Sequence, residues 1–259
     1  MRRELVVAPW SSRFHGPGME EGPAAMAAVL GADTWWGVDF DLEAPPEQAL
    51  AAGLPNLADT VRGAADPLAL LGECTLAPAV TAGLRRRHPD LALVWLDAHG
   101  DLNTPETTPS GFLGGMPFAT LLGWCHDGLR SAVELDPALP EERAALVGAR
   151  DLDPGERDAI ARSRLVVADD VAAALAGLPD DAPLHVHLDG DVLDPEDAPG
   201  VDFPAPGGWR LPHLVDEMAA LAATGRVVGV SLCCGNPRRD PEGRSAAAYA
   251  RALEPVLGA

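Results

Sequence analysis

Short apolar runs alternate with longer amphipathic segments along most of the chain. The apolar runs have the length and composition of buried strands, at residues 5–8, 68–71, 91–96, 145–148, 165–168, 184–188 and 227–232. The amphipathic segments predict helices, several with Pro near the first turn, at residues 22–30, 75–87, 115–124, 154–163 and 212–223. Strands that alternate with helices predict an α/β fold, a three-layer α/β/α sandwich around a mostly parallel sheet.

Polar clusters follow several of the predicted strands, at the point where each strand ends. They occupy residues 72–74, 97–101, 150–153, 189–191 and 233–236. In parallel α/β sheets the ligand site lies beyond the carboxyl ends of the strands. We therefore expect a functional site at this edge of the sheet.

Two of these clusters alternate carboxylates or imidazoles with other residues. Asp97, His99 and Asp101 are each two residues apart, and the run from His185 to Asp191 has the same spacing. In an extended chain such side chains share a face and can converge on one point. Burying them unpaired costs several kcal/mol each, so a compensating group is expected.

Two explanations are open for these carboxylates. They could cap helices or pair with Arg, or they could bind metal. Two clusters at the same end of one sheet favour metal, and oxygen ligands with one imidazole favour Mn²⁺ or Mg²⁺ over a closed structural zinc site. Four carboxylates suggest two ions, with carboxylates bridging them.

Composition narrows the class of protein. The 259 residues are 47% apolar and contain no linker, repeat or low-complexity block, which predicts a single domain over residues 1–259. The formal charge of 19 − 39 = −20 disfavours nucleic acid and acidic membrane surfaces as partners and favours a cation.

The chain carries no sign of a membrane or secretory destination. No apolar run approaches the roughly 20 residues that span a bilayer, and the N-terminal sequence lacks the features of a signal peptide, so we expect a cytoplasmic protein. The four cysteines, Cys74, Cys125, Cys233 and Cys234, are too few and too irregular for a disulfide framework. We expect free thiols or metal ligands.

The motifs resemble those of the arginase (ureohydrolase) family. DAHGDLNTPETTPSG at 97–111 is similar to the family's DAHxD segment and the loop after it, and HLDGDVLDP at 187–195 is similar to its SxDxDxxDP segment. GMEEGPAAMAAVL at 18–30 and GARDLDPGE at 148–156 are also similar to family stretches, so the resemblance spans most of the chain. It implies a parallel α/β/α sandwich with two Mn²⁺ ions per chain.

The resemblance also implies roles for individual residues. Asp97, His99, Asp101, Asp189 and Asp191 match metal ligands, and Asp101 would orient a metal-bridging hydroxide that attacks a linear C–N bond. Asn103 and Ser110 match residues that hold an α-carboxylate. Asp153, with Glu156 nearby, matches a residue that faces an α-ammonium group, although each of these could instead be a loop residue that satisfies its own backbone. Together they favour an amino-acid-like substrate.

The sequence departs from the family pattern at three positions. Cys74 stands where the family has the His that is its sixth metal ligand, and a thiolate prefers Zn²⁺ or Fe²⁺ to Mn²⁺. Gly114 replaces a His that helps to transfer protons, for which His126 and His187 are conceivable substitutes. Cys234 replaces the Glu that pairs with the substrate guanidinium, which a thiol cannot reproduce.

These departures leave the substrate open. Weak or absent arginase activity is expected, and the pattern is similar to that of Nω-hydroxy-L-arginine amidinohydrolases, whose substrate is less basic. A non-catalytic family member that binds metal or an amino acid is the alternative. A nucleotide-binding protein is excluded, because the turns after the strands contain no GxGxxG or GxxxxGK[ST] motif. Family resemblance suggests trimers or hexamers.

Overall fold

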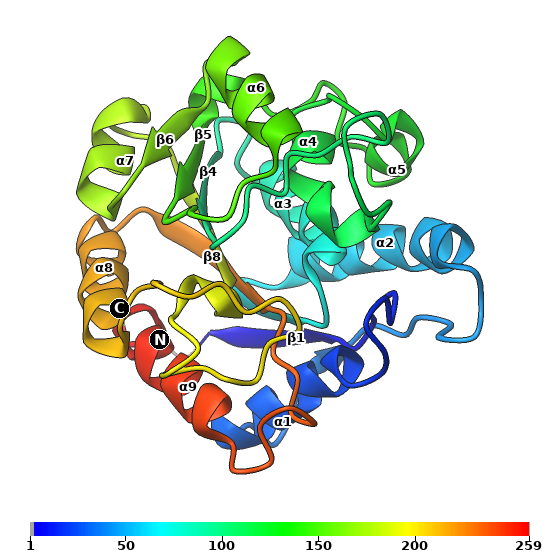
Figure 1. Cartoon of the computed structure of the whole chain (residues 1–259), viewed down its shortest axis with the longest axis vertical. Helices are drawn as coiled ribbons and strands as arrows, with labels where there is room; N and C mark the ends of the chain where they lie inside the picture. The colour runs from blue at the N-terminus through cyan, green and yellow to red at the C-terminus, as the bar shows by residue number, and fades with distance from the viewer. Residues whose placement is uncertain (1–2, 259) are drawn as a thin grey trace.

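A single parallel sheet forms the centre of the protein (Figure 1), whose computed structural model describes residues 3–258. All pairs of neighbouring strands are parallel, in the order β2-β1-β3-β8-β7-β4-β5-β6. The strands are β1 Glu4–Ala8, β2 Trp36–Gly37, β3 Pro67–Leu71, β4 Ala92–Leu96, β5 Ala144–Val147, β6 Val166–Ala168, β7 Leu184–Asp189 and β8 Val227–Cys233. Every predicted strand is confirmed to within about a residue, and only the two-residue edge strand β2 was not predicted.

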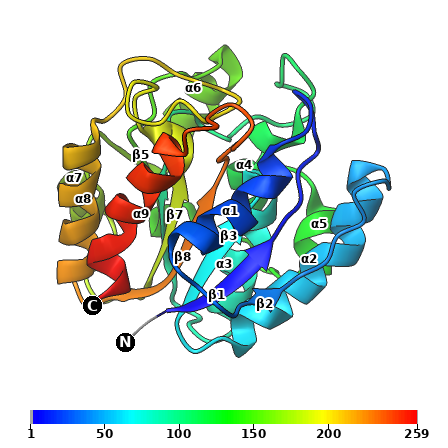
Figure 2. The same ribbon diagram turned by 90° about the horizontal axis from the view of Figure 1, so that it is seen from below.

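Helices cover both faces of this sheet (Figure 2). They are α1 Gly22–Val29, α2 Pro46–Gly63, α3 Ala77–Arg85, α4 Pro117–Leu121, α5 Asp127–Ala132, α6 Pro154–Arg162, α7 Val171–Gly177, α8 Leu211–Ala223 and α9 Arg244–Leu257. One apolar core packs α2 and α3 on one face, and a second packs α1, α8 and α9 on the other. The predicted three-layer sandwich is confirmed. Within residues 3–258, no helix has the length and apolarity that crossing a membrane requires.

The topology brings the predicted polar clusters together. Strands β3, β8, β7, β4 and β5 are consecutive neighbours in the sheet, and each is followed by one of those clusters. Because all these strands are parallel, their carboxyl ends lie at one edge of the sheet. The expected position of the site is therefore the one that the fold provides.

Two fully buried histidines on β7 are satisfied by a chain of hydrogen bonds. His185 Nδ1 lies 3.1 Å from the Thr81 hydroxyl, and its Nε2 lies 2.9 Å from the Ser231 hydroxyl. That hydroxyl also lies 2.8 Å from His187 Nδ1. His185 and His187, which precede Asp189 on the strand, thus have polar partners inside the sheet. Burial lowers the pKa of His185 to about 3.

This buried imidazole predicts a loss of stability in acid. The folded chain keeps His185 neutral, whereas an unfolded His has a pKa of about 6.5, so unfolding takes up a proton as the pH falls below that value. Between pH 6 and pH 5 the wild type should lose about 1 kcal/mol more unfolding free energy than His185→Asn. Urea unfolding at both pH values, in chelator, measures the difference, and equal losses in the two proteins would contradict it.

Candidate metal centre

A cavity of about 250 Å³ lies at the carboxyl edge of the sheet. Most of the predicted site residues line it, namely Cys74, His99, Asp101, Asn103, Ser110, Asp153, Glu156, Asp189, Asp191 and Cys234. Asp97 does not line the cavity and is almost completely buried, with 1% of its surface exposed. The fold therefore gathers the whole predicted set at one place.

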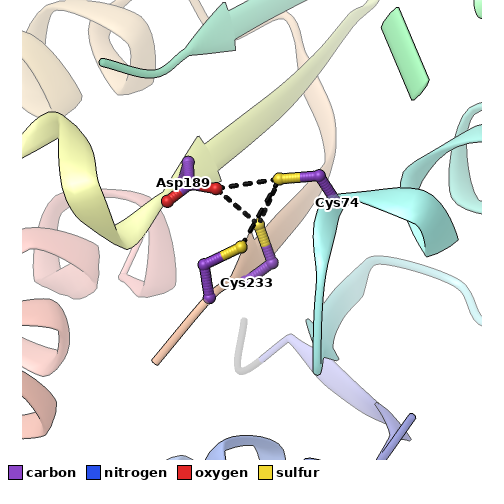
Figure 3. Close-up of side chains that lie close together, drawn as sticks. Cys74, Asp189 and Cys233 are labelled. Atoms are coloured by element: carbon purple, nitrogen blue, oxygen red, sulfur yellow. Dashed lines mark hydrogen bonds between the residues drawn. The ribbon is translucent and has the colours of Figure 1, made fainter. Parts of the chain in front are cut away.

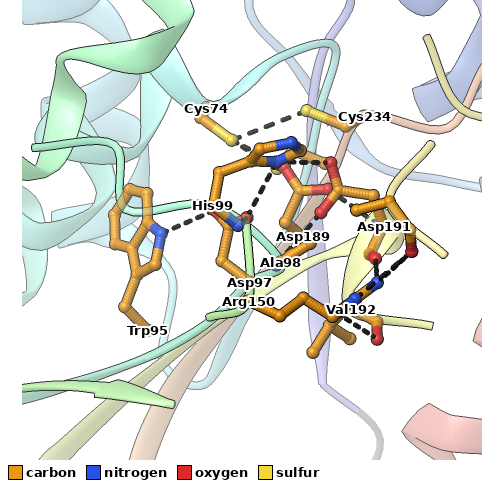
Figure 4. Close-up of polar contacts among 12 residues, drawn as sticks. Cys74, Trp95, Asp97, Ala98, His99, Arg150, Asp189, Asp191, Val192 and Cys234 are labelled. Carbon is orange, nitrogen blue, oxygen red and sulfur yellow. Dashed lines mark hydrogen bonds and ion pairs between the residues drawn. The ribbon is translucent and has the colours of Figure 1, made fainter. Parts of the chain in front are cut away.

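One group of possible ligands combines two carboxylates and an imidazole. His99 Nδ1 lies 3.1 Å from Asp191 Oδ2 and 3.5 Å from Asp97 Oδ1 (Figure 4). Trp95 Nε1 donates to the other Asp97 oxygen at 2.8 Å, and the backbone amide of Ala98 donates to Asp191 Oδ1 at 3.3 Å. These contacts hold Asp97 and Asp191 in fixed orientations, with His99 between them.

A second group contains Cys74, Asp97 and Asp101, whose ligand atoms lie within 4.8 Å of one another. Asp97 thus belongs to both groups, whereas His99 and Asp101 fall in different ones. This differs from the expectation that Asp97, His99 and Asp101 converge on one point. Strand β4 ends at Leu96 and Asp101 has a positive φ of 51°, so the alternation of an extended chain does not continue to Asp101. The arrangement offers two adjacent cation positions that share Asp97.

The carboxylates of this centre are not neutralised by arginine. Arg150 lies beside them, but its guanidinium donates to backbone carbonyls of Asp191, Val192 and Ala205 (Figure 4). Within residues 3–258, no arginine forms an ion pair with Asp97, Asp101, Asp189 or Asp191. The explanation by Arg pairs is therefore not supported.

Electrostatics and unmet hydrogen bonding fit bound cations. Burial, together with the neighbouring Asp191, raises the pKa of Asp97 to about 7. Burial also raises the pKa of Asp101 and of Asp189 well above the usual range. Among the described residues, Asp101 Oδ2 is one of the few buried side-chain oxygens without a hydrogen-bond partner. Charged carboxylates here need a positive partner, which two divalent cations would supply.

The predicted substrate-binding residues Asn103, Ser110, Asp153 and Glu156 line the same cavity. Asn103 Nδ2 donates to Asp153 Oδ2 at 2.8 Å, while the exposed Ser110 accepts from the backbone amide of Phe112. Both Glu156 oxygens accept backbone amides, those of Asp153 and Leu102, so Glu156 caps helix α6 and ties it to the loop after β4. Glu156 therefore fixes the position of Asp153.

The structure shows what stands at the position of the missing proton-transfer His. A Cβ added to Gly114 would meet the ring of Phe112 at 2.2 Å, so that ring fills the space a side chain at 114 would take. Of the two conceivable substitutes, neither lines the cavity. His126 Nε2 lies 3.2 Å from Met116 Sδ, and His187 is fully buried within the sheet.

Two features of the site were not predicted from the sequence. Cys233 was expected, like the other cysteines, to be a free thiol or a metal ligand, but its place in the site was not predicted: its sulfur lies 3.3 Å from that of Cys74 and 3.4 Å from Asp189 Oδ2 (Figure 3). Phe203 also lines the cavity and stacks on Phe112 with ring centroids 5.0 Å apart. No sequence motif signalled Phe203, whereas the adjacent cysteines were a visible signal for Cys233.

Comparison with known proteins places this site in a family. The sequence profile of the arginase family matches residues 4–258. The arginase of Bacillus subtilis (strain 168) is 36% identical over 205 residues, covering 74% of this chain and 69% of that protein. The N(omega)-hydroxy-L-arginine amidinohydrolase of Streptomyces lavendulae is 35% identical over 189 residues, covering 72% and 66%.

Solved structures agree with the sequence comparison. A 1.7 Å crystal structure of arginase from Bacillus subtilis subsp. subtilis str. 168 superimposes with a TM-score of 0.90 at 28% sequence identity, covering 99% of this chain and 98% of that one. The resemblance inferred from the motifs is confirmed at the level of the family, which typically has a binuclear manganese centre. The chain belongs to the arginase family of ureohydrolases.

Proposed function

We propose that this protein hydrolyses a linear C–N bond in a guanidino or hydroxyguanidino group of an amino-acid-like substrate. The observation that carries the proposal is that one cavity is lined by two groups of side chains of different chemistry. The first group provides ligands for two cations, and the second contains the hydrogen-bonded Asn103–Asp153 pair. A substrate held by its amino-acid end would extend its side chain toward the cations.

The first group would hold two divalent cations, at least one of them Mn²⁺, through Cys74, Asp97, His99, Asp101, Asp189 and Asp191. When bound, such ions polarise the substrate and lower the pKa of a bound water. Asp101 lines the cavity, and its Oδ2 has no hydrogen-bond partner among the described residues. This oxygen would therefore orient the attacking water and accept its proton. We assign Asp101 this catalytic role.

The substrate's α-amino and α-carboxylate groups would bind at the second group of side chains. Asn103 and Ser110 offer an amide and a hydroxyl to the α-carboxylate, and Asp153 offers a carboxylate to the α-ammonium group. Glu156 acts indirectly, because its two backbone hydrogen bonds position Asp153.

Cys234 supports a hydroxyguanidino substrate over arginine. The residue at 234 faces the cavity as a thiol, which cannot form the bidentate pair that a carboxylate makes with guanidinium. One relative carries the name N(omega)-hydroxy-L-arginine amidinohydrolase, which agrees with this substrate class.

The proposal predicts a substrate preference. Metal-loaded protein should release ornithine from Nω-hydroxy-L-arginine with a kcat/KM at least about tenfold above that for L-arginine, because the guanidinium of L-arginine finds no carboxylate at 234 and a hydrogen bond to a charged group contributes about 1.5 to 3 kcal/mol. Amino-acid analysis of the product under identical loading measures both. Equal turnover of the two compounds contradicts the hydroxyguanidino assignment.

The role of Asp153 predicts a change in KM. Asp153→Asn keeps an N-cap of equal quality for helix α6 but removes the charge, so KM for the amino-acid substrate should rise about 10- to 100-fold with little change in kcat. The same substrate without its α-amino group serves as control, since its KM should not change. A fall in kcat with unchanged KM would instead show that Asp153 does not bind the ammonium group.

A non-catalytic role is the second candidate, favoured by the substitutions at Cys74, Gly114 and Cys234. Such a protein would bind metal or an amino acid but would hydrolyse neither Nω-hydroxy-L-arginine nor L-arginine. The two candidates also differ in what they require of the metal centre, since only the hydrolase needs both cations at once.

We further propose that the chain assembles as a trimer or hexamer, as the family resemblance suggests.

A further inference from the structure

Three thiols and one carboxylate meet at the wall of the cavity, brought together from the ends of three different strands. Cys74 follows β3, Asp189 ends β7, Cys233 ends β8 and Cys234 comes directly after it. The Cys74 sulfur lies 2.8 Å from Asp189 Oδ2, 3.3 Å from the Cys233 sulfur and 3.5 Å from the Cys234 sulfur (Figures 3 and 4). The four ligand atoms all lie within 4.8 Å of one another. This set is called the sulfur cluster below.

The sulfur cluster has the dimensions of a tetrahedral metal site. With metal–sulfur distances of about 2.3 Å and metal–oxygen distances of about 2.0 Å, ligand atoms around one ion lie about 3.5 to 3.8 Å apart. The observed separations from Cys74 are 2.8, 3.3 and 3.5 Å, so the thiols need to move outward by only a few tenths of an ångström to admit an ion.

The donor set differs from that of the neighbouring group. Asp97, His99 and Asp191 offer oxygens and one imidazole, which suit Mn²⁺. Three sulfurs and one oxygen suit a thiophilic ion such as Zn²⁺ and bind Mn²⁺ poorly. Cys74 can serve either the sulfur cluster or the group with Asp97 and Asp101, and the two additional thiols draw it toward the former.

A neighbouring histidine holds the Cys233 sulfur in the way that groups around a metal ligand do. His187 Nε2 lies 3.6 Å from the Cys233 sulfur, and its other ring nitrogen is held by Ser231. A ring held in this way orients the sulfur and can donate a hydrogen bond to it, as groups around metal ligands do. Cys125, by contrast, lies apart from the other cysteines, with its sulfur 3.6 Å from the Thr120 hydroxyl.

We propose that Cys74, Asp189, Cys233 and Cys234 form a binding site for a thiophilic divalent cation of the zinc class, beside an oxygen-rich site for Mn²⁺. The centre then holds two different metals, and Cys233 is a ligand that the family pattern does not contain. The inference rests on the proposed function in treating both positions as one active centre, but its test does not depend on turnover.

Co²⁺ titration of the reduced full-length protein tests the site, because thiolate ligation of Co²⁺ gives charge-transfer absorption in the near ultraviolet. The wild type should show this absorption at one Co²⁺ per chain, and added Zn²⁺ should abolish it while Mn²⁺ in excess should not. Cys233→Ser should weaken Zn²⁺ binding, measured by competition with Co²⁺, by at least about tenfold. Cys125→Ser is the matched control, with an unchanged spectrum.

The outcomes separate this proposal from the proposed function. Three results would overturn the sulfur cluster as a metal site, even where the protein hydrolyses its substrate. The absorption could be missing in the wild type, it could be abolished equally well by Mn²⁺, or it could be unchanged in Cys233→Ser. If Cys74→Ser fails to fold, Cys233→Ser and Cys234→Ser still decide the matter, because both lie at the end of β8 and can be checked by circular dichroism. The expected spectrum in a protein without turnover would support the site while the proposed function fails.

Discussion

Asp191→Asn should lower turnover at least about 100-fold and remove one cation per chain while the fold is kept. Asp191 Oδ2 lies 3.1 Å from His99 Nδ1, in the group that suits Mn²⁺, so an uncharged amide there weakens both the ligand and its orientation. The amide oxygen can still accept the backbone amide of Ala98, which preserves the local structure. Steady-state kinetics, elemental analysis and circular dichroism of one preparation measure all three.

Asp170→Asn is the matched control for this substitution. Asp170 caps helix α7, where Asn serves equally well, and it does not line the cavity. Its activity and metal content should therefore equal those of the wild type. Undiminished turnover in Asp191→Asn would refute the assignment of Asp191 as a ligand.

Cys234→Glu should shift the substrate preference toward arginine. The new carboxylate can pair with a guanidinium in the bidentate manner that a thiol cannot, and a hydrogen bond to a charged group contributes about 1.5 to 3 kcal/mol. The ratio of kcat/KM for L-arginine to that for Nω-hydroxy-L-arginine should rise about 10- to 100-fold. Because Cys234 also belongs to the sulfur cluster, metal content is measured alongside.

Cys234→Gln distinguishes charge from shape in this experiment. Glutamine has the size of glutamate but cannot neutralise a guanidinium. The ratio of kcat/KM for L-arginine to that for Nω-hydroxy-L-arginine should therefore stay near the wild-type value in Cys234→Gln. A ratio that rises equally in both variants would mean that the volume at 234, and not a carboxylate, selects the substrate.

The strand pattern and the position of the site could be read from the sequence. Apart from β2 and the two histidines of β7, the strands of the sheet are short runs of mainly apolar residues, because a parallel sheet covered on both faces needs apolar side chains on both. The polar residues that follow β4 and β7 could not be explained as part of such strands. Since parallel strands end at one edge, the sequence was sufficient to place these residues together.

Helix α2 was not predicted, because its composition is unusual for a helix. It contains Gly53 and Pro55, residues that ordinarily interrupt a helix. The helix persists because Leu50, Leu54 and Leu57 recur at helical spacing and are completely or almost completely buried, and because Gly53 admits the ring of Phe40 at a distance a Cβ would not allow. Only the packed partner reveals why these residues are tolerated.

The role of Cys233 could not be predicted from alternation. Adjacent residues on a strand point to opposite faces, so Cys233 and Cys234 should diverge. Cys234 has a positive φ of 65°, which turns the chain at the end of β8 and leaves the two sulfurs within 4.8 Å. Likewise, the ring of Phe112 over Gly114 depends on the loop conformation, which no motif specifies.

The metal content of the wild-type chain tests the central claim most directly. Protein purified without chelator and reconstituted with Mn²⁺ and Zn²⁺ together should contain about two ions per chain by elemental analysis, because the side chains offer two cation positions, the sulfur cluster and the group of Asp97, His99 and Asp191. One ion or none after reconstitution would contradict a binuclear hydrolytic centre and would favour the non-catalytic candidate.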